Sequence, residues 1–165
     1  MLSPGLRISS VFHVKEMPAS EDLQFRSAKV REFFDWWRCL RADRMPRRSD
    51  FDILDHAPLA ASLFLVRKLD AGRYQMRIQG EEVIAIFGYN PTGRIVSADD
   101  PVESFGHALK EYYDSVIAEG WPRVCVGDLS HADRGHVRFE SIDCPLLGDG
   151  EKDMPFIVGV IEQIA

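Results

Sequence analysis

Residues 73–94 read RYQMRIQGEEVIAIFGYNPTGR, and this stretch decides the fold. Its first seven residues alternate between polar and apolar, which places Tyr74, Met76 and Ile78 on one face of a β-strand. After the strand the spacing becomes helical, and a short apolar run ends at Gly88, a residue type that often terminates helices. The sequence therefore predicts a strand that passes almost without a linker into a short helix, followed at once by a Gly-Tyr-Asn-Pro turn.

The segments around this stretch are also periodic. An apolar run at 63–66 and the Asp-Ala-Gly turn at 70–72 predict a first strand that pairs antiparallel with the second. The segment 102–119 repeats apolar side chains every three or four residues, which predicts the longest helix. Three more strands are predicted at 122–129, 136–147 and 156–164. The last of these is apolar on both faces, as expected of a central strand that is covered on both sides.

An earlier helix is predicted ahead of the hairpin, with Ser27 as its N-cap. Its apolar stripe contains Val30, Phe33, Phe34, Trp37 and Leu40, with Trp36 beside it. A helix this rich in aromatic residues must cover a core or meet a partner chain. We interpret its aromatic side chains as a dimer or partner surface, because a lone sheet domain would leave them exposed. They are Phe33, Phe34, Trp36 and Trp37.

The order of these elements indicates an α+β domain with a five-stranded antiparallel sheet, helices on one face and an N-terminal helical extension. Two strands, then helices, then three strands do not fit the repeated βαβ pattern of a parallel sheet. We divide the chain into an irregular N-terminal lead-in (1–25), an N-terminal helix and loop (26–60) and a core (61–165).

Composition and charge narrow the function classes. The chain has 165 residues and a net charge of −6, which argues against binding nucleic acid or an anionic membrane over its whole surface. Its three cysteines, Cys39, Cys125 and Cys144, are odd in number and far apart, and form neither a disulfide framework nor a CxxC metal site. No apolar run approaches the roughly 18 residues that span a bilayer, and the N-terminus is a poor signal peptide. We therefore expect a soluble, cytoplasmic protein.

Three stretches resemble a known family. The turn FGYNPTGR (87–94), the segment LRADRMPRRSDFD (40–52) and the hairpin LFLVRKL…RYQMRIQG resemble the PAS sensory domain. They are similar to one bacterial subgroup of PAS proteins, mostly single-domain and alphaproteobacterial, and the resemblance covers residues 33–164. The residues that match this pattern or make its turns are Trp37, Arg41, Pro46, Arg48, Asp52, Gly80, Gly88 and Gly93.

The resemblance implies a fold and a function. In a PAS domain the sheet wraps around a small cavity, and the helices after the second strand form the other wall, so that strand must pass at once to helix. The resemblance implies a non-catalytic sensory module of a bacterial signalling pathway. Such a module would bind a small molecule, a signalling partner such as a kinase or regulator, or both. We expect a homodimer in which the N-terminal helix carries the signal.

Seven side chains from different elements are expected to converge on the cavity. They are Tyr74, Met76, Phe87, Tyr112, Val124, Phe139 and Val160. Their aromatic and thioether groups suit a small apolar or amphipathic ligand. The plainer interpretation is that these residues simply fill the core.

The cofactors of other PAS proteins find little support in this sequence. Flavin-binding members carry a reactive cysteine in an Asn-Cys-Arg-Phe-Leu motif, whereas this chain has no cysteine between residues 40 and 124. Haem-binding members place a histidine on the long helix, but His107 lies at the margin of its apolar face. We expect neither a cysteinyl-flavin adduct nor haem. We expect no metal, because LSHADRGH (129–136) has the composition of a turn and no strict ligand spacing.

Two other function classes stay open. The first is a small cavity enzyme, an isomerase or hydratase, and a buried cavity carboxylate with a strongly raised pKa would favour it. Its candidate residues are Glu81, Glu82, His107 and Glu140. The second is a DNA-binding regulator that uses an arginine cluster, which the net charge opposes. The cluster consists of Arg38, Arg41, Arg44, Arg47 and Arg48. We interpret it as salt bridges that hold the early helix to the following loop.

Overall fold

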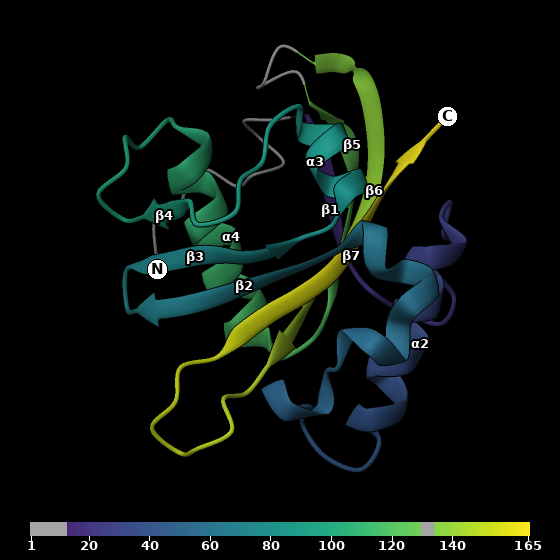
Figure 1. Ribbon diagram of the computed structural model, residues 1–165, viewed down its shortest axis with the longest axis vertical. Helices are drawn as coiled ribbons and strands as arrows, with labels where there is room; N and C mark the ends of the chain where they lie inside the picture. The colour runs from purple at the N-terminus through teal and green to yellow at the C-terminus, as the bar shows by residue number, and fades with distance from the viewer. Residues whose placement is uncertain (1–12, 130–133) are drawn as a thin grey trace.

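The computed structural model describes residues 13–129 and 134–165, which form an α+β domain built on one sheet (Figure 1). In chain order the elements are β1 (Val14–Pro18), α2 (Ala28–Arg41), the 3₁₀ helices η1 (Arg48–Asp50) and η2 (Ile53–Ser62), β2 (Leu63–Asp70), β3 (Arg73–Gln79), α3 (Glu81–Phe87), β4 (Ile95–Ser97), α4 (Phe105–Glu119), β5 (Arg123–Leu129), β6 (Arg134–Leu146) and β7 (Phe156–Ile164). The three predicted helices and the five predicted strands are all present.

The sheet contains seven strands in the order β1-β5-β6-β7-β2-β3-β4. All neighbouring strands are antiparallel, as predicted, but the predicted count of five strands is wrong. The five predicted strands form the centre, and β1 and β4 are added at the two edges. β1 lies within the segment that we expected to be irregular, and β4 has only three residues. Both strands are short and form by pairing with residues distant in the sequence. The periodicity of a few neighbouring residues does not predict such pairing.

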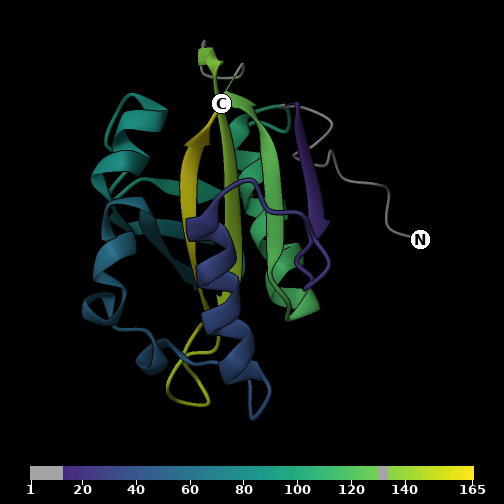
Figure 2. The ribbon, with the colours of Figure 1, turned by 90° about the vertical axis from the view of Figure 1, so that its right-hand side faces the viewer.

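Helices cover both faces of the sheet, which corrects the expectation of helices on one face. α3 and α4 pack on one face, here called the α4 face, and α2 and η2 pack on the other, the α2 face (Figures 1 and 2). In β7, Ile157 and Ile161 belong to the core on the α4 face, whereas Val158 and Val160 belong to the core on the α2 face. The prediction that this strand is central and covered on both sides is thereby confirmed.

The passage from β3 to α3 depends on two glycines. A Cβ atom added to Gly80 would lie 2.2 Å from the carbonyl oxygen of Ala61, so only glycine lets the chain turn this close to the end of η2. Gly88 ends α3 with a φ of 82°, a left-handed conformation that residues with side chains disfavour. The chain between them folds α3 over the α4 face, where Val83 and Ile86 are buried.

β3 changes face within its length. The adjacent residues Leu65 and Val66 of β2 pair with Ile78 and Met76 of β3. Arg77, between these two, has no partner on β2 and is the extra residue of a β-bulge. Tyr74 and Met76 therefore belong to the core on the α4 face, while Ile78 packs against the core on the α2 face. The expectation that these three side chains share one face is wrong, because the bulge interrupts the regular alternation of faces along β3.

The aromatic stripe of α2 packs against its own sheet. Phe33, Phe34 and Trp37 are at most 1% exposed. The indole N–H of Trp37 donates to the carbonyl oxygen of Pro145, 2.9 Å away on β6. Trp36 is half-buried beside His56, with their ring centres 4.7 Å apart. The prediction of a dimer or partner surface is therefore wrong for Phe33, Phe34 and Trp37, because these side chains cover the α2 face of their own sheet.

A buried carboxylate holds the start of α2. Glu140 of β6 is 2% exposed and accepts hydrogen bonds from the backbone N–H groups of Arg26 and Ser27, at 2.9 and 3.0 Å. Ser27 is the N-cap, as predicted, because its hydroxyl accepts a hydrogen bond from the N–H of Val30. The bonds to the N–H groups of Ser27 and Val30 satisfy donors that the start of a helix leaves unpaired.

The motif residues after α2 have structural contacts. Arg48 places its guanidinium over the rings of Phe51 and Phe156, 5.7 and 5.6 Å from their centres. Asp52 caps η2 by accepting a backbone N–H, and Pro46 is buried. These residues tie the loop to the α2 face of the domain.

Candidate functional site

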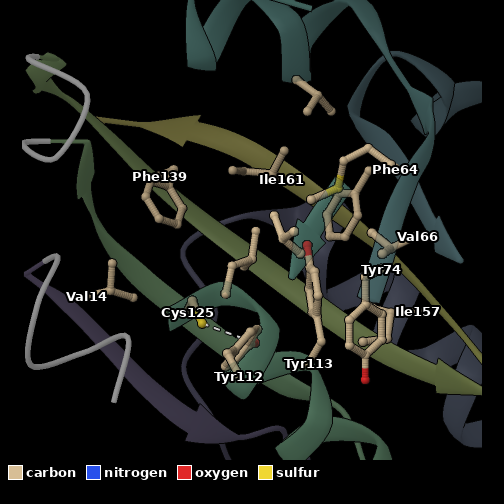
Figure 3. Packing of buried hydrophobic residues seen from close by; sticks show 14 of the residues in the cluster. Val14, Phe64, Val66, Tyr74, Tyr112, Tyr113, Cys125, Phe139, Ile157 and Ile161 are labelled. Atoms are coloured by element: carbon tan, nitrogen blue, oxygen red, sulfur yellow. Dashed lines mark hydrogen bonds between the residues drawn. The ribbon is translucent and has the colours of Figure 1, made fainter. Parts of the chain in front are cut away.

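A cavity of about 100 Å³ lies on the α4 face, between the sheet and the helices α3 and α4. Its wall is mostly apolar and includes Phe64, Met76, Phe87, Leu109, Phe139 and Ile161. Figure 3 shows side chains of this region, with Phe64, Phe139 and Ile161 of the sheet lying across from Tyr112 and Tyr113 of α4. One water needs about 10–15 Å³, so the cavity has room for several waters or one small organic molecule.

Several of the side chains predicted to line the cavity do so. Met76, Phe87, Tyr112 and Phe139 form part of its wall. Tyr74 is buried in the same core but lies behind the wall, because its ring packs on Tyr113, 5.2 Å away between centres. Its hydroxyl donates to Asp114 of α4 over 2.6 Å.

Val124 and Val160 do not reach the cavity, and the prediction is wrong for both. They belong to the core on the α2 face. Their neighbours Cys125 and Ile161 line the cavity instead. Successive strand residues point to opposite faces, so an error of one position moves a side chain to the other side of the sheet.

Three buried polar groups of the cavity form a chain of hydrogen bonds. The hydroxyl of Tyr112 on α4 donates to Oδ2 of Asp143 on β6 over 2.6 Å. The thiol of Cys125 on β5 donates to the same hydroxyl over 3.2 Å, the contact drawn as a dashed line in Figure 3. All three residues line the cavity and are at most 5% exposed.

Burial governs the ionisation of these groups. Removal from water raises the pKa of Asp143 to about 7, against the lowering effect of the hydrogen bond from Tyr112. Burial also raises the pKa of Tyr112 and of Cys125, so both stay protonated near neutral pH. The cavity thus contains a carboxyl group that titrates near neutral pH, beside two groups that hold their protons.

The turn after α3 forms the rim of the cavity. Tyr89 and Arg94 line the cavity and are exposed, so they lie where it meets the surface. Arg94 donates to the hydroxyl of Tyr89 over 2.6 Å, and its guanidinium lies 5.9 Å from the centre of that ring. Gly93 precedes Arg94 with a φ of 86°, which the tight turn requires.

The residues proposed for a cavity enzyme lie elsewhere in the described structure. Glu81 and Glu82 occupy the first turn of α3, and Glu82 forms an ion pair with α2. Glu140 caps α2 on the opposite face. His107 lies on α4 with its Nε2 3.9 Å from Glu111 and is absent from the cavity wall that the structure describes.

Asp143 is a candidate functional residue that escaped prediction from the sequence. It follows Phe139 by four positions and Ser141 by two, and all three line the cavity. Strand residues two and four apart share a face, so the placement of Phe139 in the cavity also implied Asp143. The structure therefore supplies the buried cavity carboxyl group, with a raised pKa, that would favour an enzyme.

The arginine cluster is largely engaged in contacts within the domain. Arg44 forms two hydrogen bonds of 2.6 Å with Asp50, and these bonds lower the pKa of Asp50 to about 2. Arg38 pairs with two acidic residues, and Arg48 lies over two aromatic rings. Arg41 is exposed in the last turn of α2. These ion pairs do not join α2 to the loop: Arg38 pairs with Asp35 of its own helix and with Glu21 ahead of it, whereas Arg44 and Asp50 both lie in the loop.

The part of the chain that the structure describes, residues 13–129 and 134–165, contains neither a metal-binding cluster nor a membrane-spanning helix. Within them, no group of three or more His, Cys, Asp or Glu side chains is placed to hold a metal ion. None of the helices described there is long and apolar enough to cross a bilayer. Residues 130–133 of the predicted turn lie outside the described part of the chain.

Comparison with known proteins identifies the family. A family model described as a PAS domain matches residues 25–162. None of the curated proteins compared with the chain matches it, and no solved structure does. The match covers every helix and every strand except β1 and the last residues of β7, and it agrees with the motifs and with the order of the elements. The chain belongs to the PAS domain family.

Proposed function

We propose that this chain is a non-catalytic sensory module whose cavity binds a small molecule and whose bound state is read by a partner protein. Membership of the PAS family indicates a sensory or signalling role in general, and PAS domains often dimerise or bind signalling proteins. The observation that carries the proposal is the apolar cavity of about 100 Å³ on the α4 face. Protein cores are normally packed without such voids, so a hollow with a few convergent polar groups is a candidate binding site.

Native mass spectrometry of the full chain purified from its source tests this proposal. We expect the native mass to exceed the denatured mass by a small ligand, and the same spectrum reports whether the chain is a homodimer. Met76→Trp should fill the cavity and release the ligand, whereas Ile78→Trp, on the same strand but the α2 face, should retain it.

Two results would overturn the proposed ligand site. One is a retained ligand that Met76→Trp does not release, with both variants shown to be folded by circular dichroism. The other is a wild-type protein that retains nothing and whose amide NMR spectrum does not respond to xenon under pressure, since xenon enters accessible apolar cavities.

A cavity enzyme is the second candidate, and Asp143 is the observation that favours it. A carboxyl group with a pKa of about 7 can accept and return a proton at neutral pH, as an isomerase requires. Deuterium exchange at the carbons beside the carbonyl of cyclohexanone, followed by NMR, tests for such proton transfer. Exchange that the wild type accelerates and Asp143→Asn does not would favour an enzyme, and equal rates would favour the sensory module.

A further inference from the structure

The polar end of the cavity accepts hydrogen bonds but offers few. Tyr112 uses its proton in the bond to Asp143, and Cys125 uses its proton in the bond to Tyr112. Within the described part of the chain, the Asp143 carboxyl group receives a side-chain hydrogen bond only at Oδ2, which leaves Oδ1 as an acceptor. A ligand that bonds to the ionised Asp143 must therefore donate.

Asp143 also has no positively charged partner among the described residues. The charged side chain with the largest electrostatic effect on Asp143 is Glu16 of β1, whose negative charge raises the pKa of Asp143. The nearby Arg123 of β5 is paired with Glu16 and with Glu119. Arg94 lies at the exposed rim, bonded to Tyr89. A carboxylate surrounded by apolar groups is stabilised by a cation that is brought to it, so a charged ligand would supply the missing counterion.

We propose that the cavity selects a small apolar molecule that carries a basic nitrogen, an amine or amidine with a body of about one ring, whose N–H group donates to Asp143. The apolar wall around Phe64, Phe139 and Ile161 holds the body of the molecule. This inference rests on the proposed function, because it assigns a ligand class to the same cavity. It does not depend on which partner protein recognises the ligand-bound form.

A series of probes that differ in one group tests the assignment with the full chain. Benzylamine, benzyl alcohol and benzoate share a ring and carry a cation, a neutral hydroxyl and an anion. Their affinities are measured by titration calorimetry or by amide chemical shifts at pH 8. We expect benzylamine to bind about tenfold or more tightly than benzyl alcohol, because hydrogen bonds to charged groups are the stronger ones, and benzoate to bind most weakly.

The pH dependence gives a second and independent readout. Tyr112, Tyr113 and Cys125 hold their protons at neutral pH because burial raises the pKa of each, so Asp143 is the cavity group that titrates. The amine needs the ionised carboxylate, and the ionised fraction rises from pH 6 to pH 8. The affinity for benzylamine should therefore increase about tenfold over this range, and that for benzyl alcohol should change little.

Asp143→Asn should reduce the affinity for benzylamine to that for benzyl alcohol and remove its pH dependence. The control is Ile142→Val, which changes the adjacent residue of β6 on the α2 face, outside the cavity, and should keep both the preference and the pH dependence. Tyr112→Phe keeps the carboxyl group, so it should keep the preference even if the affinities change.

Three outcomes would overturn the ligand class. They are tighter binding of benzyl alcohol or benzoate than of benzylamine, a preference for benzylamine that survives in a folded Asp143→Asn, and no binding of benzylamine at millimolar concentration. The first two leave the proposed function intact, because a small molecule still binds. After the third, the retained mass and the xenon response decide whether the cavity binds ligands of another class.

Discussion

At the scale of single residues, burial of Asp143 links the cavity to the stability of the domain. Its pKa is raised from the ordinary value of 3.8 to about 7 because the folded structure removes the carboxyl group from water. Between these two values the folded protein binds a proton that the unfolded chain does not, so the free energy of unfolding falls as the pH rises. Above pH 7 the carboxylate is charged in both states and this decline ends.

Asp143→Asn should therefore remove a decline in stability between pH 4 and pH 7. Urea unfolding at pH 5 and pH 8 should show that the wild type loses stability relative to the variant by a few kcal/mol at most, since one pKa unit is worth about 1.4 kcal/mol. Ser141→Ala is the control and should follow the wild-type profile. Parallel profiles of the wild type and Asp143→Asn would contradict a raised pKa at this position.

At the scale of elements, the junction between β3 and α3 depends on the absence of a side chain at Gly80. Gly80→Ala would place a Cβ atom 2.2 Å from the carbonyl oxygen of Ala61, and backbone would have to move. We expect a loss of about 1–3 kcal/mol or more in the free energy of unfolding. The control is Gly72→Ala in the β2–β3 turn, where the nearest atom would be 3.6 Å away. Equal effects of the two substitutions in thermal or urea unfolding would show that the close approach is not what requires glycine.

The elements that were predicted correctly are those whose signal is local. The spacing along 102–119 predicts α4 because a helix has about 3.6 residues per turn, so apolar residues three or four apart lie on one side, whatever they pack against. β1 and β4 have no such signal, because five and three residues become strands only by pairing with β5 and β3. The bulge at Arg77 could not be predicted from the sequence of β3 alone, because it depends on how β3 pairs with β2.

At the scale of the whole molecule, cover on both faces of the sheet limits what a sequence can reveal about the cavity. Val160 and Ile161 are both buried and apolar, so hydrophobicity does not tell which of them faces α4. The same holds for Val124 and Cys125. Asp143 was overlooked because a carboxyl group in a strand is normally assigned to solvent, and here the α4 face buries it. These choices depend on packing between layers, which the pattern of one strand does not contain.

The same two-sided architecture predicts that two adjacent residues of β7 have separate effects. Ile161→Ala should lower the free energy of unfolding by about 2–5 kcal/mol and enlarge the cavity, so that xenon shifts the amide signals of α4 more strongly than in the wild type. Val160→Ala should cost somewhat less, because it removes fewer buried methyl groups, and should leave the xenon response of α4 unchanged. Any new xenon shifts in Val160→Ala should fall on α2, whose aromatic residues pack on that face. An equal change of the α4 signals in Val160→Ala and Ile161→Ala would mean that the sheet does not separate the two cores. The cavity would then extend to both faces of the sheet.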